Sequence, residues 1–111
     1  MCERKNLRMV SQSKYGYIGY CAGCDRYNLV FNNIFLLLKK VELKGLGEIT
    51  DKSLGVWFMD SAIGGGKQVS MQTPLPNVYF AFSAPEYEEF KRLINEAVLI
   101  LNANQIIQHK N

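Results

Sequence analysis

The stretch that decides the fold is GYIGYCAGCDRYNLVFNN, residues 16–33. Its second half carries large apolar side chains at every second position, Tyr27, Leu29 and Phe31, which is the period of a β-strand with one buried face. Its first half is rich in tyrosine and contains a β-branched isoleucine, a composition typical of strands. The short turn sequence CAGCDR joins the two halves, so the stretch predicts a β-hairpin.

Cys21 and Cys24 fall at the tip of this predicted hairpin, and three interpretations stay open. Two thiolates at this spacing can bind one Zn²⁺, which needs two further ligands. The remaining cysteine and the single histidine complete the predicted metal set Cys2, Cys21, Cys24 and His109. A redox dithiol would require a helix N-terminus, which lowers the thiol pKa, whereas strands flank this pair. A tight turn with two partly buried thiols and no cofactor is the simplest interpretation.

Further strands and two helices are predicted along the chain. The strand-like segments are LRMVSQ (7–12), NIFLLL (33–38), a segment after the loop GGGK (64–67), and NVYFAF (77–82). The least decided stretch, residues 39–59, suits a short amphipathic helix, although Gly45 and Gly47 each cost it about 1 kcal/mol relative to alanine.

The best-defined element is the last helix. Ser83 is the predicted N-cap, with Pro85 in the first turn and Glu86 placed to close a capping box. Apolar residues then recur at helical spacing: Tyr87, Phe90, Leu93, Ile94, Ala97, Val98 and Leu101. Strands followed by a packed helix predict a single α+β domain over residues 1–111. It should contain an antiparallel sheet with a long C-terminal helix packed on it, either alone or together with one short middle helix.

The composition excludes several classes of protein. With 48% hydrophobic and 21% charged residues and a net charge of +3, the 111 residues are typical of an ordinary globular protein and too weakly basic to indicate nucleic acid. The longest apolar run, IFLLL (34–38), is too short to span a bilayer. MCERKNLRMV (1–10) lacks the apolar segment of a secretory signal, and an odd number of cysteines argues against a disulfide framework. We therefore expect a cytoplasmic protein with reduced thiols and no membrane partner.

Catalysis has little support in the sequence. With His109 the only histidine, a Ser/His or Cys/His pair would depend on the last few residues. GGGK (64–67) lacks the spacing of a phosphate-binding loop. KYGYIGY (14–20) is similar to the aromatic strand with which RNA-recognition domains stack bases, but too few residues precede it for that fold. We predict a non-enzymatic interaction or accessory domain with no catalytic residues; the alternatives are a zinc-dependent nucleic-acid-binding protein and, third, a thiol-dependent enzyme.

Apolar residues exceed what one packed helix can cover. AVLIL (97–101) is apolar on every side of the last helix, QII (105–107) extends that surface, and IFLLL (34–38) is apolar on both faces. A two-fold partner covers such a surface by setting the same patch against itself. We predict a homodimer whose interface uses the last helix or the chain end, with a folded-back tail as the alternative, and an unidentified protein partner.

The sequence resembles a small family of uncharacterised bacterial proteins, found mainly in Bacteroidetes and classed as a domain of unknown function. The resemblance rests on MCE (1–3), GYIGYCAGCDRYNLVFNN (16–33) and VYFAFSAPEYEEFKRLINEA (78–97). The family pattern implies a histidine two residues after the first cysteine, which with the three cysteines would form a zinc site. Arg4 stands at that position here and cannot ligate a metal. The resemblance implies fold and origin but no activity.

Overall fold

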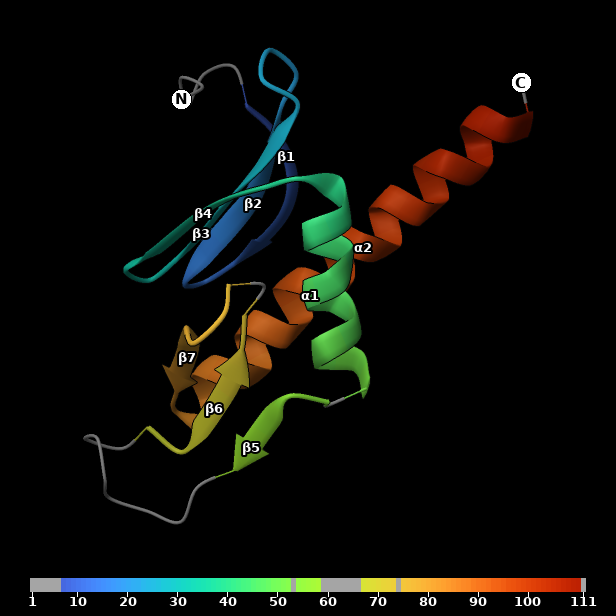
Figure 1. Ribbon diagram of the computed structural model, residues 1–111. Coiled ribbons are helices and arrows are strands. Elements are labelled where there is room, and N and C mark those ends of the chain that lie inside the picture. The colour runs from blue at the N-terminus through green and yellow to red at the C-terminus, as the bar shows by residue number, and fades with distance from the viewer. Residues whose placement is uncertain (1–6, 53, 59–66, 74, 111) are drawn as a thin grey trace.

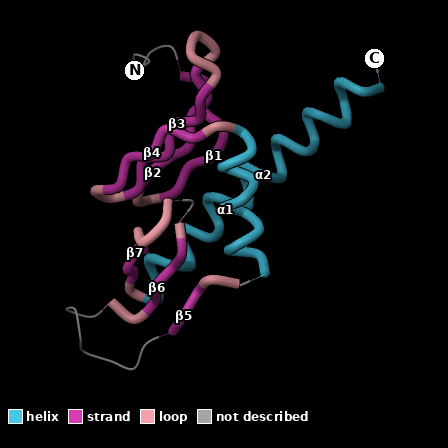
Figure 2. Tube along the Cα trace, viewed as in Figure 1, coloured by secondary structure: helices cyan, strands magenta, loops and turns pink. Residues whose placement is uncertain are grey.

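The computed structural model describes residues 7–52, 54–58, 67–73 and 75–110, with side chains up to residue 104. Seven strands and two helices lie within these ranges (Figures 1 and 2). The predicted α+β class is confirmed. The strands are divided between two antiparallel sheets, rather than belonging to one as expected.

The larger sheet, sheet A, is an antiparallel meander with its two end strands at the edges. Its strands in spatial order are β1 (Leu7–Ser13), β2 (Gly16–Cys21), β3 (Arg26–Phe31) and β4 (Ile34–Leu38). The predicted hairpin is therefore β2 and β3, joined by the CxxC turn. Ile18 pairs with Leu29, which pairs with Leu36, so one apolar row crosses the sheet on its helix side.

The smaller sheet, sheet B, follows the first helix. It contains β5 (Val56–Phe58), β6 (Val69–Gln72) and β7 (Tyr79–Phe82) in that spatial order. Val69 and Met71 of the central strand are fully buried, whereas Trp57 is half exposed. The sequence did not predict β5, because three residues are too few to establish the alternation of a strand.

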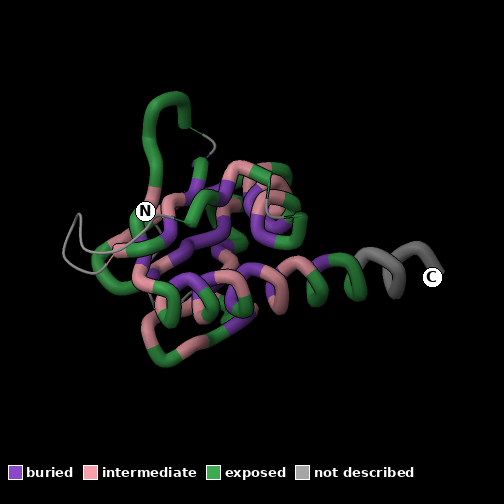
Figure 3. The backbone as a smooth tube through the Cα atoms, turned by 90° about the horizontal axis from the view of Figure 1, so that it is seen from below, coloured by how far each residue is buried: buried purple, intermediate pink, exposed green. Residues whose placement is uncertain are grey.

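The two helices are α1 (Lys40–Lys52) and α2 (Ala84–Lys110). The predicted capping box begins α2: the Ser83 N–H donates to Glu86 Oε1 at 2.8 Å, and the Glu86 N–H donates to Ser83 Oγ at 3.3 Å. The predicted apolar stripe of α2 faces the core as far as Leu101 (Figure 3). Only Val98 in that stripe is half-buried.

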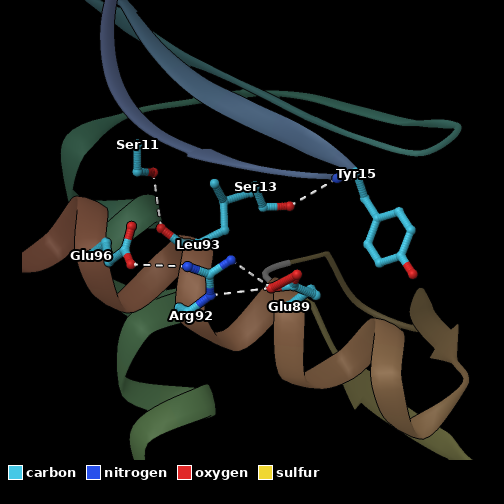
Figure 4. A network of polar contacts seen from close by, with 7 residues as sticks. All are labelled: Ser11, Ser13, Tyr15, Glu89, Arg92, Leu93 and Glu96. Carbon is cyan, nitrogen blue, oxygen red and sulfur yellow. Dashed lines mark hydrogen bonds and ion pairs between the residues drawn. The ribbon is translucent and has the colours of Figure 1, made fainter.

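A side-chain hydrogen bond joins β1 to α2 (Figure 4). The buried Ser11 hydroxyl donates to the Leu93 carbonyl at 3.0 Å, which satisfies a polar group inside an apolar interface. Beside it, Arg92 forms ion pairs with Glu89 at 2.7 Å and Glu96 at 3.5 Å along α2. Sheet A is therefore attached to the middle of the long helix by a specific contact as well as by packing.

Some apolar surface stays uncovered, as the sequence suggested. On α2, Leu99 is 69% and Ile100 40% exposed, and the C-terminal part of the helix extends beyond the rest of the molecule (Figures 1 and 3). The predicted interface residues 105–107 have side chains outside the described set. Neither helix, over the parts described, is long and apolar enough to cross a membrane.

Candidate functional sites

The two cysteines of the hairpin differ in environment. Cys21 ends β2 and is only 1% exposed, on the face of sheet A away from the helices. It is disulfide-bonded, so our expectation of reduced thiols is wrong for this residue. Cys24 lies in the turn, is exposed, and is not disulfide-bonded. Cys2 and the His109 side chain, the other two predicted ligands, lie outside the described residues.

The predicted zinc set stays a prediction, because two of its four ligands, Cys2 and the His109 side chain, lie outside the described residues. Zinc binds cysteine as the thiolate, and a sulfur in a disulfide is not a thiolate, so Cys21 cannot be a ligand in this state. Among the residues whose positions are described, no three Cys, His, Asp or Glu side chains form a group that could hold a metal. We therefore derive no function through zinc.

The CxxC turn is stabilised by its own polar contacts. Asp25 adopts a left-handed backbone with φ 54°, a conformation that aspartate tolerates in turns. The Tyr20 hydroxyl donates to the Asp25 carboxylate at 2.8 Å, and this hydrogen bond raises the pKa of Tyr20. The Arg26 guanidinium donates to the carbonyl oxygens of Asp25 at 3.0 Å and Cys24 at 3.4 Å. These contacts favour the interpretation of the segment as a structural turn.

A polar cavity of about 290 Å³ lies beside this turn, and we call it the hairpin pocket. Its lining comes from β1, β2, the turn, β3, α1 and α2: Arg8, Tyr20, Asp25, Tyr27, Lys40, Leu101 and Asn104. Sequence reasoning missed this site, because residues from so many elements share no spacing that a linear pattern could reveal.

Two tyrosines form the aromatic wall of the hairpin pocket. The rings of Tyr20 and Tyr27 are 4.9 Å apart, and the Arg8 guanidinium lies 5.6 Å from the Tyr20 ring centre. Tyr27 is only 6% exposed. Burial raises the pKa of Tyr27, the Asp25 carboxylate raises it further, and Arg8 opposes both. The Tyr27 hydroxyl is therefore protonated at neutral pH and can donate a hydrogen bond.

A second, apolar cavity of about 130 Å³ runs along β4, and we call it the β4 groove. It is lined by Leu36, Leu37, Leu38, Glu42, Thr73, Leu75, Val78 and Phe80. Its two polar side chains are already engaged: Thr73 donates to the Val78 carbonyl at 2.7 Å, and Glu42 accepts from the Lys39 N–H at 2.7 Å. The groove therefore suits an apolar occupant.

The tyrosine run of residues 14–20 does not form a row of exposed aromatic rings. Tyr15 packs edge-on against Phe31, with ring centres 5.7 Å apart, and Tyr20 packs against Tyr27 on the helix side of sheet A. Strand alternation places Tyr17 on the opposite face. Stacking of successive bases needs several rings on one open surface, and this strand does not supply them.

The fold and these two sites define a small α+β domain with two antiparallel sheets and a long helix. A family model described as a family of unknown function (DUF6686) matches residues 1–98, so the chain belongs to that family. The predicted resemblance to a domain of unknown function is thereby confirmed. No curated protein and no solved structure matches the chain.

Proposed function

We propose that this protein is a non-enzymatic interaction domain that binds a second copy of itself through the edge of β4. The observation that carries the proposal is an apolar edge strand with two exposed large side chains. All five residues of Ile34–Leu38 are apolar, and Phe35 and Leu37 are 44% and 45% exposed.

The two edges of sheet A differ in a way that supports this choice. An exposed edge presents unpaired N–H and C=O groups, and proteins protect such edges with charges, prolines or bulges. The β1 edge has a bulge between Met9 and Ser11 and carries the charged Arg8. The β4 edge has no such feature, which favours it as an interface.

Self-pairing of β4 is compatible with its sequence. In an antiparallel arrangement centred on Leu36, Phe35 of one copy lies opposite Leu37 of the other. The charged Lys39 then lies opposite the neutral Asn33 of the second copy, so like charges do not meet. Backbone hydrogen bonds would join the two four-stranded sheets into one of eight strands, and the exposed apolar side chains would cover each other.

The surface predicted from the sequence, the last helix, is the competing interface. Leu99 and Ile100 are exposed there, but a helix offers only side-chain packing because its backbone groups are already bonded. β4 offers both packing and backbone hydrogen bonds. A foreign extended peptide could use the same edge, and the experiment below separates these cases.

The test compares Leu37→Lys with the matched control Leu99→Lys by light scattering on an eluting peak. Both side chains are exposed, so neither substitution disturbs the core, and circular dichroism confirms folding. We expect wild type and Leu99→Lys at twice the 12.6 kDa chain mass, and Leu37→Lys at the chain mass. Dissociation by Leu99→Lys alone would transfer the interface to α2. A wild-type monomer at high micromolar concentration would refute self-association and leave β4 for a foreign segment.

A further inference from the structure

The hairpin pocket contains charges of both signs that do not neutralise one another. Arg8 and Asp25 both line it, yet neither they nor Lys40 takes part in an ion pair within the described structure. Tyr20 explains the separation, because its hydroxyl holds the Asp25 carboxylate while its ring lies against the Arg8 guanidinium. The pocket thus presents two cations and one anion to whatever enters it.

An independent observation is that Tyr27 offers the pocket a hydrogen-bond donor. Tyr27 is only 6% exposed. Within the part of the chain that the structure describes, its hydroxyl forms no hydrogen bond with another protein group. Among the described side chains, the fully enclosed polar atoms without a partner are Asn28 Oδ1 and Tyr87 OH, so the Tyr27 hydroxyl is not fully enclosed. It therefore reaches the open space of the pocket as an unused donor, although the rest of its side chain is packed.

We infer that the hairpin pocket binds an acidic amino acid, the small molecule whose charges complement this lining. Two carboxylates would meet Arg8 and Lys40, and the ammonium group would meet Asp25. Tyr27 would donate to a carboxylate oxygen, a charge-assisted hydrogen bond of the stronger kind. The volume of about 290 Å³ is just below the usual range of small-molecule sites, about 300–1,000 Å³, so the ligand must be small.

The charge pattern distinguishes this ligand from simpler ones. A plain anion such as inorganic phosphate could use Arg8 and Lys40 but would be repelled by Asp25. Glutarate has both carboxylates of glutamate and no ammonium group, and glutamine has the ammonium group and one carboxylate. Each analogue leaves one charged side chain of the pocket unmatched, so each should bind less tightly than glutamate.

The experiment is isothermal titration calorimetry with L-glutamate, L-glutamine, glutarate and inorganic phosphate. We expect glutamate to bind at least about tenfold more tightly than each analogue, since loss of one charge-assisted contact weakens binding by this factor or more. Equal or tighter binding of phosphate or glutarate would overturn the inference in favour of a general anion site. Absence of binding by all four at millimolar concentration would refute a ligand site.

Variants test the role of each side chain. Asp25→Asn should weaken glutamate binding but not glutarate binding, because only glutamate carries the ammonium group. Tyr27→Phe should weaken glutamate binding several-fold while preserving the packed ring. Arg8→Gln should abolish measurable binding, whereas the control Lys14→Gln removes the same charge from the ring of Tyr15, away from the pocket, and should have no effect. Equal losses in Arg8→Gln and Lys14→Gln would show a non-specific charge effect and overturn the assignment.

Discussion

Gly45 and Gly47, two residues apart in α1, should respond in opposite directions to the same substitution. A Cβ added at Gly45 would meet no atom within 4 Å, whereas one at Gly47 would lie 2.8 Å from Val98 Cγ2 on α2 and 3.8 Å from Ile94 Cγ2. Replacement of each glycine by alanine therefore changes the helix propensity equally but the packing differently. The difference in stability between Gly45→Ala and Gly47→Ala therefore measures the energetic effect of the close contact between α1 and α2.

The magnitudes follow from two opposing terms. Alanine in a helix interior is more favourable than glycine by about 0.8–1 kcal/mol, so Gly45→Ala should raise the free energy of unfolding by about that amount. At Gly47 the same gain is offset by overpacking, which costs about 1–3 kcal/mol. Val98 cannot move aside easily, because a β-branched residue in a helix has one strongly preferred rotamer. We expect Gly47→Ala to lower the stability by about 1 kcal/mol.

The assay is urea unfolding followed by circular dichroism, with thermal unfolding as a second measure. A change of 1 kcal/mol shifts the melting temperature of a domain this size by about 4 °C or more. Val98→Ala in the Gly47→Ala background should restore part of the lost stability and give a coupling free energy of about 1 kcal/mol. If Gly47→Ala is as stable as Gly45→Ala, or if the Val98 substitution shows no coupling, the close contact between the helices is refuted.

Two further predictions concern the N-terminus of α2 and the β2–β3 hairpin. The hydrogen bonds from Lys67 and from the Ser83 amide lower the pKa of Glu86. The Glu86 carboxylate therefore stabilises the folded protein above its unfolded-state pKa of about 4.3. This contribution is lost as the pH falls through the lower folded-state pKa. Glu86→Gln should thus reduce the free energy of unfolding by about 1 kcal/mol at pH 7 and by much less once the pH lies below the lowered folded-state pKa. A difference that persists at the acid end of the profile would contradict this. At Gly16 an added Cβ would lie 1.8 Å from the Val30 carbonyl oxygen, so Gly16→Ala should destabilise by about 2 kcal/mol or more, and an unchanged melting temperature would refute the register of β2 and β3.

The elements that the sequence predicted well are those with a strong local signal. The capping box at Ser83 and the apolar stripe after it define α2 without reference to the rest of the chain. The alternation in residues 27–31 does the same for β3. In both elements the apolar side chains that form the local pattern are also the ones that pack in the core. The structure confirms the burial predicted for them.

The features that the sequence did not predict depend on contacts between distant segments. From the sequence alone, Gly47 could be interpreted only as a residue that destabilises its helix. Its absent side chain makes room for Val98 of α2, about fifty residues later, and this contact is not visible in the local sequence. Arg8, Tyr27 and Lys40 carry no shared pattern, because the meander of sheet A and the start of α1 bring them to one cavity. The cysteine pattern was visible, but its spacing could not show that Cys21 is disulfide-bonded.

The hairpin pocket and the β4 groove, which runs along the proposed interface strand, meet at the first turn of α1, where Lys40 lines the pocket and Glu42 lines the groove. This turn is held by two hydrogen bonds: Glu42 accepts from the Lys39 N–H at 2.7 Å, and the Leu43 N–H donates to the Lys39 carbonyl at 3.0 Å. Coupling between sites requires an element with two arrangements that both ligands bias, and these hydrogen bonds favour a single arrangement of the turn. We therefore expect the proposed ligand binding and the proposed self-association to be independent of each other, so that each proposal is decided by its own test.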